Sequence, residues 1–283
     1  MPAIATAREL WASAHPGPSL VVTTLTVALG VASGLEPWRL IVLTAAVLAG
    51  QLSVGISNDV IDAARDRAVG RRDKPIARGA VRIGTAWSVA IACVLLAVGL
   101  SALLGLGMLA AHVVALASAW SYNLGLKATP YSLLPFLLSF GLFPSFATLA
   151  AVHPQAAAGW AWVAGAALGA AVHLSNVLPD FDDDEQTGIR GLPHRLGPRV
   201  SAVVASLGVI AGAVAVLLGP ARFHIADVPL LAWVFFGVVV LIAALACLVA
   251  LREAPARTVF RLVMLAALLL AVQLIATGGA LAA

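Results

Sequence analysis

Apolar runs of membrane-spanning length recur along this 283-residue chain and limit its fold more than any other feature. A transmembrane helix needs about 20 predominantly apolar residues. Only 11% of the residues are charged, too few to cover the surface of a soluble domain, where about 25% is usual. We therefore expect an all-α polytopic membrane protein with about nine transmembrane helices. The expected spans are 18–34, 39–57, 83–101, 105–124, 131–150, 158–178, 200–219, 228–250 and 259–282.

The basic residues predict which side of the membrane each connection faces. Cytoplasmic loops carry an excess of Lys and Arg. With a cytoplasmic N-terminus, nine spans leave 15 of the 17 basic residues in the cytoplasm, and only Arg39 and Arg222 outside. The Ala-, Gly- and Arg-rich composition suggests a GC-rich bacterial genome, so we expect a multi-pass protein of the bacterial plasma membrane.

Charged residues gather in two segments, 58–82 and 180–199, both on the predicted cytoplasmic side. The segments share the template N-x3-D-x3-D-x3-G-x-R-x2-P, and the second copy begins 118 residues after the first. One copy covers 58–75 in the N-terminal half and the other covers 176–193 in the C-terminal half. We therefore expect an internal repeat within a single membrane-embedded domain, 1–283.

The spacing of the template has a chemical meaning if each copy is helical. Residues i, i+4 and i+8 lie on one helix face, so each copy presents one Asn and two Asp as an oxygen-rich stripe. Oxygen ligands suit Mg²⁺, which binds one or two carboxylates together with waters and substrate phosphates. Two facing stripes would hold a diphosphate, and basic side chains would neutralise it. The stripes are Asn58, Asp62, Asp66 and Asn176, Asp180, Asp184, and the basic candidates are Arg71, Arg72, Lys74, Arg78 and Arg190.

Loops between membrane helices are also charged simply because they are wet, and their basic residues set topology. Solvation does not require Asn-Asp-Asp at four-residue spacing twice, so we favour the ligand stripes. For Arg65, Arg67, Arg82 and Arg199 topology is the simpler interpretation. Gly70 and Gly188 are expected to end the two helices and turn the chain.

The two segments resemble the signatures of the UbiA-type superfamily of intramembrane prenyltransferases. The signature N-D-x-x-D-x-x-x-D is complete in the first copy, and D-x-x-x-D-x-x-x-G is complete in the second. Residues 122–127 (Tyr-Asn-Leu-Gly-Leu-Lys) are similar to the Tyr…Leu-Lys element of that family. Lys74 and Gly191 depart from its pattern, which has Arg and often Thr at these positions.

The resemblance implies nine helices around a central cavity and both motifs in the cytoplasm. It implies Mg²⁺, with two ions expected, and a prenyl diphosphate donor that ionises to an allylic carbocation. The catalytic carboxylates would be Asp62, Asp66, Asp180 and Asp184, and Lys127 would join the basic residues at the diphosphate. The metal set would be Asn58, Asp59, Asp62, Asp66, Asn176, Asp180 and Asp184, and the candidates for lining the cavity are His173, Tyr122 and Asn123.

Three functions remain open at this stage. The leading one transfers the prenyl chain to a small aromatic or quinone-precursor acceptor in the bilayer, with no nucleic acid partner. The second is a terpene cyclase on the same scaffold, which the aromatic content of only 6% disfavours. The third is a transporter, because transporters also carry internal repeats and buried charges. No general base can be assigned from the sequence.

Overall fold

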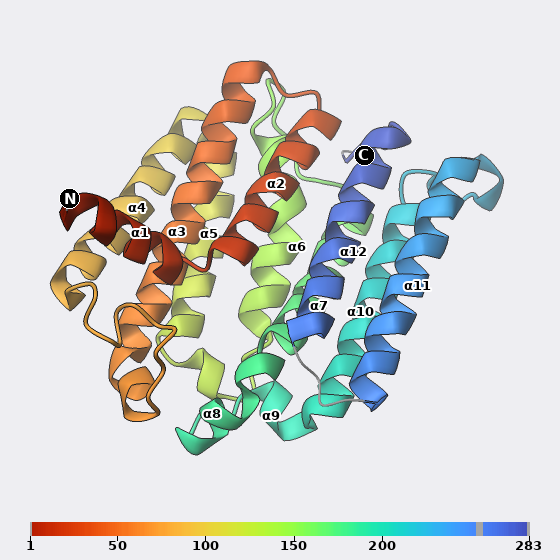
Figure 1. Cartoon of the computed structure of the whole chain (residues 1–283). Helices are drawn as coiled ribbons and strands as arrows, with labels where there is room; N and C mark the ends of the chain where they lie inside the picture. Colours follow the sequence, from red (N-terminus) through yellow and green to blue (C-terminus); the bar gives the residue numbers. More distant parts are fainter. Residues whose placement is uncertain (1, 253–256, 282–283) are drawn as a thin grey trace.

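The structure is a computed structural model that describes residues 2–252 and 257–281, and these residues form helices without strands (Figure 1). The predicted end of the last span, at residue 282, lies outside the described residues. The long helices are α2 (Pro16–Ala32), α3 (Pro37–Ala68), α4 (Ile83–Leu103), α5 (Leu106–Asn123), α6 (Leu134–Leu149), α7 (Gly159–Asn176), α10 (Pro198–Leu218), α11 (Leu230–Arg252) and α12 (Arg257–Ala276). The shorter helices are α1 (Pro2–Ser13), η1 (Leu126–Ala128), η2 (Leu178–Asp180), α8 (Phe181–Gln186), α9 (Leu192–Leu196) and η3 (Ile225–Asp227).

The long helices correspond one to one with the predicted spans, and the all-α membrane class is confirmed. In the described ranges, six helices are long and apolar enough to cross a bilayer: α3, α4, α7 continued to Gln186, α10, α11 and α12. A seventh span results if α1 and α2, which meet at a bend of 76°, are counted together. The remaining two predicted spans are α5 and the shorter α6, so the number nine stays a prediction.

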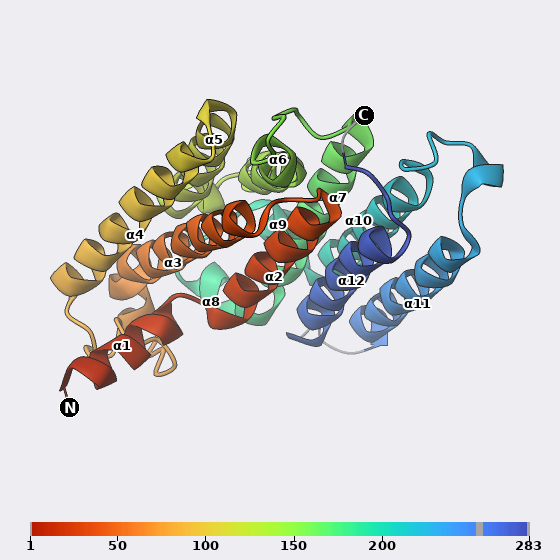
Figure 2. The same cartoon turned by 90° about the horizontal axis from the view of Figure 1, so that it is seen from above.

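The helices form an elongated layer with the two halves of the chain meeting at its centre (Figure 2). In the N-terminal half α3 packs against α2 and α4, and in the C-terminal half α7 packs against α10 and α11 packs against α12. Helix α12 also contacts α2, and α6 contacts α7, so both halves supply helices to the middle of the molecule.

Glycines allow α6 and α7 to approach closely. A Cβ atom on Gly165 would lie 2.1 Å from the backbone oxygen of Phe140, and one on Gly169 would lie 2.6 Å from that of Phe136. Small residues at four-residue spacing are the usual way in which membrane helices pack backbone to backbone. This contact holds the Phe-bearing helix α6 against the helix that leads into the second motif.

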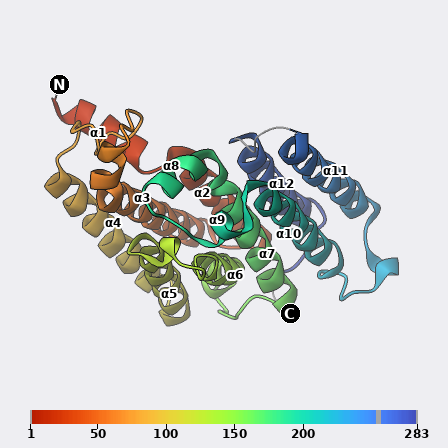
Figure 3. The same ribbon diagram turned by 90° about the horizontal axis from the view of Figure 1, so that it is seen from below.

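Both charged segments lie at the same end of the bundle, as the predicted topology requires (Figure 3). Helix α3 continues past its predicted span to Ala68 and carries the first motif beyond the apolar region. The second motif follows α7 and runs through η2 and α8. Residues before the first predicted span form α1, which lies beside α3 (Figure 1) and contacts the loop of the first motif through the ion pair of Glu9 with Arg78.

Candidate active site

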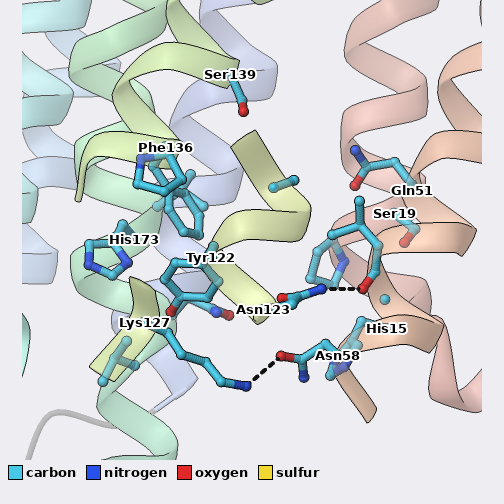
Figure 4. A pocket seen from close by; sticks show the side chains of 18 of the residues that line it. His15, Ser19, Gln51, Asn58, Tyr122, Asn123, Lys127, Phe136, Ser139 and His173 are labelled. Atoms are coloured by element: carbon cyan, nitrogen blue, oxygen red, sulfur yellow. Dashed lines mark hydrogen bonds between the residues drawn. The ribbon is translucent and has the colours of Figure 1, made fainter. Parts of the chain in front are cut away.

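A cavity of about 330 Å³ lies between α2, α3, α5, α6, α7 and α12. Carboxylates and cations line its end near α8, whereas mainly aromatic and aliphatic side chains line its interior. In Figure 4, Lys127 faces Asn58 at the charged end, and Gln51 and Ser139 lie toward the opposite end. Six of the seven predicted metal ligands line this cavity: Asn58, Asp62, Asp66, Asn176, Asp180 and Asp184.

Lys127 lies inside the first motif. Its Nζ donates to the two carboxylate oxygens of Asp62 at 2.6 and 2.5 Å, and to the amide oxygen of Asn58 at 3.2 Å. The second partner of Asp62 is Arg65, one turn later on α3, at 2.8 Å. Burial lowers the pKa of Lys127 from its usual value, although the charge of Asp62 opposes the shift.

Two arginines of the first half bridge to the second motif. Arg71 lies 3.1 Å from Asp180 and 3.5 Å from Asp183, and Arg65 lies 3.7 Å from Asp184. The two motifs therefore face each other across a narrow charged gap. The cations of the first half thus already form ion pairs with the carboxylates of the second motif, and a diphosphate with its metal ions would bind between them.

Arg71 is fixed by a third carboxylate outside the gap. Its Nε and Nη2 donate to the two oxygens of Asp73 at 2.9 and 2.8 Å. This two-fold contact lowers the pKa of Asp73 to about 2 and raises the pKa of Arg71. A planar guanidinium held in this way keeps its remaining nitrogen directed at the second motif.

The first motif has the predicted local structure, since Asn58, Asp62 and Asp66 occupy one face of the continuous helix α3. Gly70 adopts a φ of 71° after the helix end. The N–H of Arg71 then donates back to the carbonyl of Asp66 at 2.9 Å. This is the glycine-ended helix terminus in which the chain reverses without strain.

The second motif departs from the prediction of one helical stripe. Helix α7 ends at Asn176, Asp180 lies in η2, and Asp184 lies in the short helix α8. The break falls at Pro179, because proline supplies no N–H for the helix and disfavours helical geometry in the preceding residue. The motif still ends as predicted, with Gly188 at a φ of 83° and the N–H of Ile189 bonded to Asp184 at 2.9 Å.

Four predicted site residues lie away from the cavity. Asp59 faces Lys74 at 2.7 Å and His15 at 2.9 Å, and it is buried outside the cavity wall. Arg78 pairs with Glu9 of α1 instead of pointing inward. Arg72 and Arg190 are likewise exposed outside the cavity lining. Of the predicted diphosphate-binding residues, Arg71, Lys74 and Lys127 line it.

The donor set fits magnesium chemistry. Every candidate ligand on the cavity wall offers oxygen, and one or two carboxylates per ion are sufficient when phosphate and water complete the shell. No three carboxylates or histidines of the described ranges meet closely enough to hold an ion by themselves. The arrangement therefore suits ions shared between a few carboxylates and a phosphate-bearing substrate.

Gly191, which departs from the family pattern, has a packing role. A Cβ atom here would lie 2.4 Å from the backbone oxygen of Lys127 and 2.9 Å from Oγ of Ser132. The Ser132 hydroxyl accepts the N–H of Leu192 at 2.9 Å. The missing side chain thus lets the second motif rest directly on the loop that carries Lys127.

The interior of the cavity is richer in aromatic groups than the overall composition suggested. Tyr122, Asn123 and His173, which the sequence singled out, all line it. Tyr122 makes edge contacts with the rings of Phe136 and His173 at 5.1 and 5.7 Å between centroids. The other phenylalanines of the wall are Phe140, Phe143, Phe146 and Phe260.

Sequence reasoning missed three charged or titratable groups of the lining. Arg65 was assigned to topology, although its position one turn after Asp62 indicated a shared helix face. His15 carried no signal, because only the fold of α1 and α2 brings it to the first motif. His194 stacks on Phe181 at 4.6 Å, lies 3.9 Å from Asp184, and has its pKa lowered by burial.

The chain is also similar to known proteins. Residues 19–270 match the UbiA prenyltransferase family. The chain belongs to this family. The predicted family is therefore confirmed, and with it the assignment of the chain to the prenyltransferase class of enzymes. The bacteriochlorophyll synthase 33 kDa chain of Cereibacter sphaeroides is 32% identical over 205 residues, which cover 64% of this chain and 62% of that protein.

Solved structures of the family share the fold. A UbiA homologue from Aeropyrum pernix K1 superposes with a TM-score of 0.74 at 19% identity, over 91% of this chain and 97% of that one. A homologue from Archaeoglobus fulgidus, bound to GPP and Mg²⁺, gives a TM-score of 0.72 at 14% identity, over 95% and 98%. At these identities the likeness establishes the helical architecture.

Proposed function

We propose that this protein catalyses Mg²⁺-dependent transfer of an isoprenoid chain from a prenyl diphosphate to a small aromatic or quinone-precursor acceptor inside the membrane. One observation carries the proposal: two carboxylate motifs face each other, with cations between them, at the end of a cavity whose interior is apolar. A prenyl diphosphate has the same division into a charged head and an apolar tail. The Archaeoglobus homologue bound to GPP and Mg²⁺ supports the choice of donor.

Each part of the site then has a defined role. Asn58, Asp62 and Asp66 from α3 and Asn176, Asp180 and Asp184 from the second motif would hold the metal, with two ions expected. The bound Mg²⁺ supplies electrostatic stabilisation of the leaving diphosphate. Arg65, Arg71, Lys74 and Lys127 add positive charge to the same end of the cavity.

The reaction begins when the bond between C1 of the prenyl chain and the diphosphate oxygen breaks. The oxygen keeps the electron pair, and cations placed where this charge develops lower the barrier. The allylic cation must be kept from water, which the apolar interior of the cavity provides. The acceptor then attacks C1 with an electron pair and releases one proton, so that the products are the prenylated acceptor, diphosphate and H⁺.

Substitution of the motif carboxylates tests the proposal. We expect Asp62→Asn and Asp180→Asn to lose Mg²⁺-dependent release of diphosphate from a prenyl diphosphate by at least about 100-fold. The matched control is Asp182→Asn, because Asp182 is an exposed aspartate of the same segment outside the cavity. Full activity in both motif variants would reject the metal assignment, and Mg²⁺-dependent diphosphate release in the wild type would reject the transporter.

The aromatic wall keeps a terpene cyclase as the second candidate. Tyr122, Phe136 and Phe140 present rings to the cavity, and such faces can stabilise a migrating cation. Because these rings gather in the cavity, the low aromatic content of the whole chain no longer favours transfer over cyclisation. Incubation of the purified protein with Mg²⁺ and donors of different lengths, without acceptor, separates the two. A cyclic hydrocarbon product would establish the cyclase, whereas transfer requires that product appear only with acceptor.

The cellular setting belongs to the same proposal. We place the protein in a bacterial plasma membrane as a single unit, 1–283, with its N-terminus and both motifs in the cytoplasm. The cavity wall combines helices of both halves, which supports a single catalytic domain. The common end of the two motifs supports an even number of spans between them, in agreement with the four spans predicted there.

A further inference from the structure

His112 on α5 lines the cavity far from the motifs, and the proposed chemistry does not use it. Its side chain is 4% exposed, and its ring packs against that of Phe146 with 5.1 Å between centroids. The ring lies beside Gly50 of α3, eight residues before Asn58. With a rise of 1.5 Å per residue, the imidazole lies about 12 Å deeper in the cavity than the first motif.

The hydrogen bonds of Ser101 determine which nitrogen of His112 carries the hydrogen. The hydroxyl of Ser101 donates to the backbone oxygen of Ala97 at 2.8 Å. Its only hydrogen is thereby used, so at 2.7 Å it accepts a bond from Nδ1–H of His112. No carboxylate of the described residues pairs with this ring, and a neutral imidazole has one N–H. Nε2 therefore presents a lone pair.

The ring of His112 fits against α3 at a glycine. A Cβ atom on Gly50 would lie 3.0 Å from Nε2, which is tighter than ordinary contact, so the absent side chain makes room for the imidazole ring itself. Although the side chain is 4% exposed, Nε2 is not among the fully buried unpaired atoms of the described residues, and His112 lines the cavity, so Nε2 is accessible from the cavity. The residue next to Gly50, Gln51, also lines the cavity and points its amide into it (Figure 4). An acceptor that faces a cavity without a protein partner is available to a group bound in that cavity.

We propose that His112 is the acceptor-recognition residue of this enzyme. Its Nε2 accepts a hydrogen bond from an O–H or N–H group at the far end of an elongated, largely apolar acceptor, and Gln51 flanks that group. The prenyl chain itself has no such donor, so it cannot satisfy the lone pair. The inference rests on the proposed function, because it assigns to the second substrate a chemistry that the donor lacks.

The apolar tail of the donor has another place to lie. A second cavity of about 80 Å³ adjoins the first, with Val22, Phe140, Phe143, Val172 and Met264 on both walls. Its further lining is almost wholly apolar and comes from α2, α7, α10 and α12. The tail can bend into this space, which leaves the wall beside His112 to the acceptor.

A pair of probes that differ in one hydroxyl tests this assignment without knowledge of the natural acceptor. Equilibrium dialysis measures binding of 4-phenylphenol and biphenyl to the detergent-solubilised full chain. A neutral hydrogen bond contributes about 0.5–1.5 kcal/mol, or about 2- to 13-fold in affinity. We expect the wild type to bind 4-phenylphenol more tightly than biphenyl within this range, and His112→Leu to bind the two equally.

Two further variants separate recognition from packing. Gly50→Ala keeps the imidazole but places a methyl group 3.0 Å from Nε2, so the ring shifts by a few tenths of an ångström, and the variant should also lower the preference for the hydroxyl. Ser101→Ala releases Nδ1, so the preference should fall without vanishing. A preference that persists in His112→Leu would overturn the inference, as would a loss of affinity for both probes alike.

Donor binding distinguishes this inference from the function on which it rests. Geranyl and geranylgeranyl diphosphate are titrated with Mg²⁺ in parallel. If His112→Leu changes only the preference between these two chain lengths, then His112 limits the length of the prenyl tail, and the inference is wrong. If the wild type binds neither diphosphate, the proposed function fails instead, whatever the phenols do.

Discussion

Lys127 offers the sharpest test of how the charged end of the cavity works. Its Nζ lies 2.6 and 2.5 Å from the oxygens of Asp62, and both side chains are almost fully buried. A unit charge 4 Å from the leaving diphosphate contributes about 4 kcal/mol at an effective dielectric constant of 20. Loss of one such contact typically lowers kcat by about 100- to 1,000-fold. We expect this loss in Lys127→Met.

The same contacts predict an opposite effect on the metal. Lys127 neutralises Asp62, so its removal leaves Arg65 at 2.8 Å as the remaining cation on that carboxylate. Mg²⁺ should then bind the first motif more tightly. The Mg²⁺ concentration that gives half-maximal activity should therefore be lower in the variant, although its kcat is also lower. Single-turnover release of diphosphate, measured across a range of Mg²⁺ concentrations, separates the two quantities.

Arg78→Met is the matched control, because Arg78 is a predicted diphosphate ligand that the structure pairs with Glu9 outside the cavity. We expect the rate of this variant to stay within about 3-fold of the wild-type rate, because an exposed ion pair contributes little energy. The reasoning about charge placement would be refuted if Lys127→Met kept the wild-type rate, or if Arg78→Met lost as much activity as Lys127→Met.

Three further predictions concern packing, pH and topology. Gly165→Ala places a methyl group 2.1 Å from the backbone oxygen of Phe140 and should lower the free energy of unfolding by about 1–3 kcal/mol. Gly84→Ala, in open space on α4, is the control and should leave the thermal unfolding in detergent unchanged. The pKa of Asp73 is lowered from 3.8 to about 2, so its contribution to stability is present above about pH 4 and is lost as the pH falls toward 2. The unfolding temperature of Asp73→Asn should therefore be below that of the wild type above pH 4 and equal to it near pH 2. An impermeant maleimide should label Arg222→Cys in intact cells but Arg190→Cys only after permeabilisation, and the reverse pattern would contradict the orientation.

The sequence predicts most of the fold because apolar runs of bilayer length leave few alternatives. It does not predict α1, because a segment of 12 residues that contains Arg8 and Glu9 is too short to cross a bilayer and is passed over when spans are counted. The break in the second motif could have been foreseen. Pro179 lies within the proposed stripe, and a proline inside a helix removes a hydrogen bond and crowds the preceding turn.

The carboxylates of the site were predictable, whereas only half of the predicted cations, Arg71, Lys74 and Lys127, line the cavity. On a helix, spacing alone decides which face a side chain occupies, so Asp62 and Asp66 could be placed from the sequence. In the loop after Gly70 no such rule applies. Arg71 turns toward Asp180 whereas Arg72 turns away, and this difference depends on the path of the chain through Lys74 and its ion pair.

The repeat is symmetric in its carboxylates and turns but asymmetric in its cations. Both motifs present oxygen ligands and end at a glycine, yet Arg72 and Arg190, the basic residues matched by the repeat, lie outside the cavity. Within the described residues, every Lys or Arg on the cavity wall comes from the first half of the chain. Asp180 and Asp184 depend for charge neutralisation on Arg71 and Arg65 of the other half. Because these arginines face both the second motif and the place of the diphosphate, entry of Mg²⁺ at Asp180 and Asp184 would free them to bind the substrate, so metal and donor binding should be mutually cooperative.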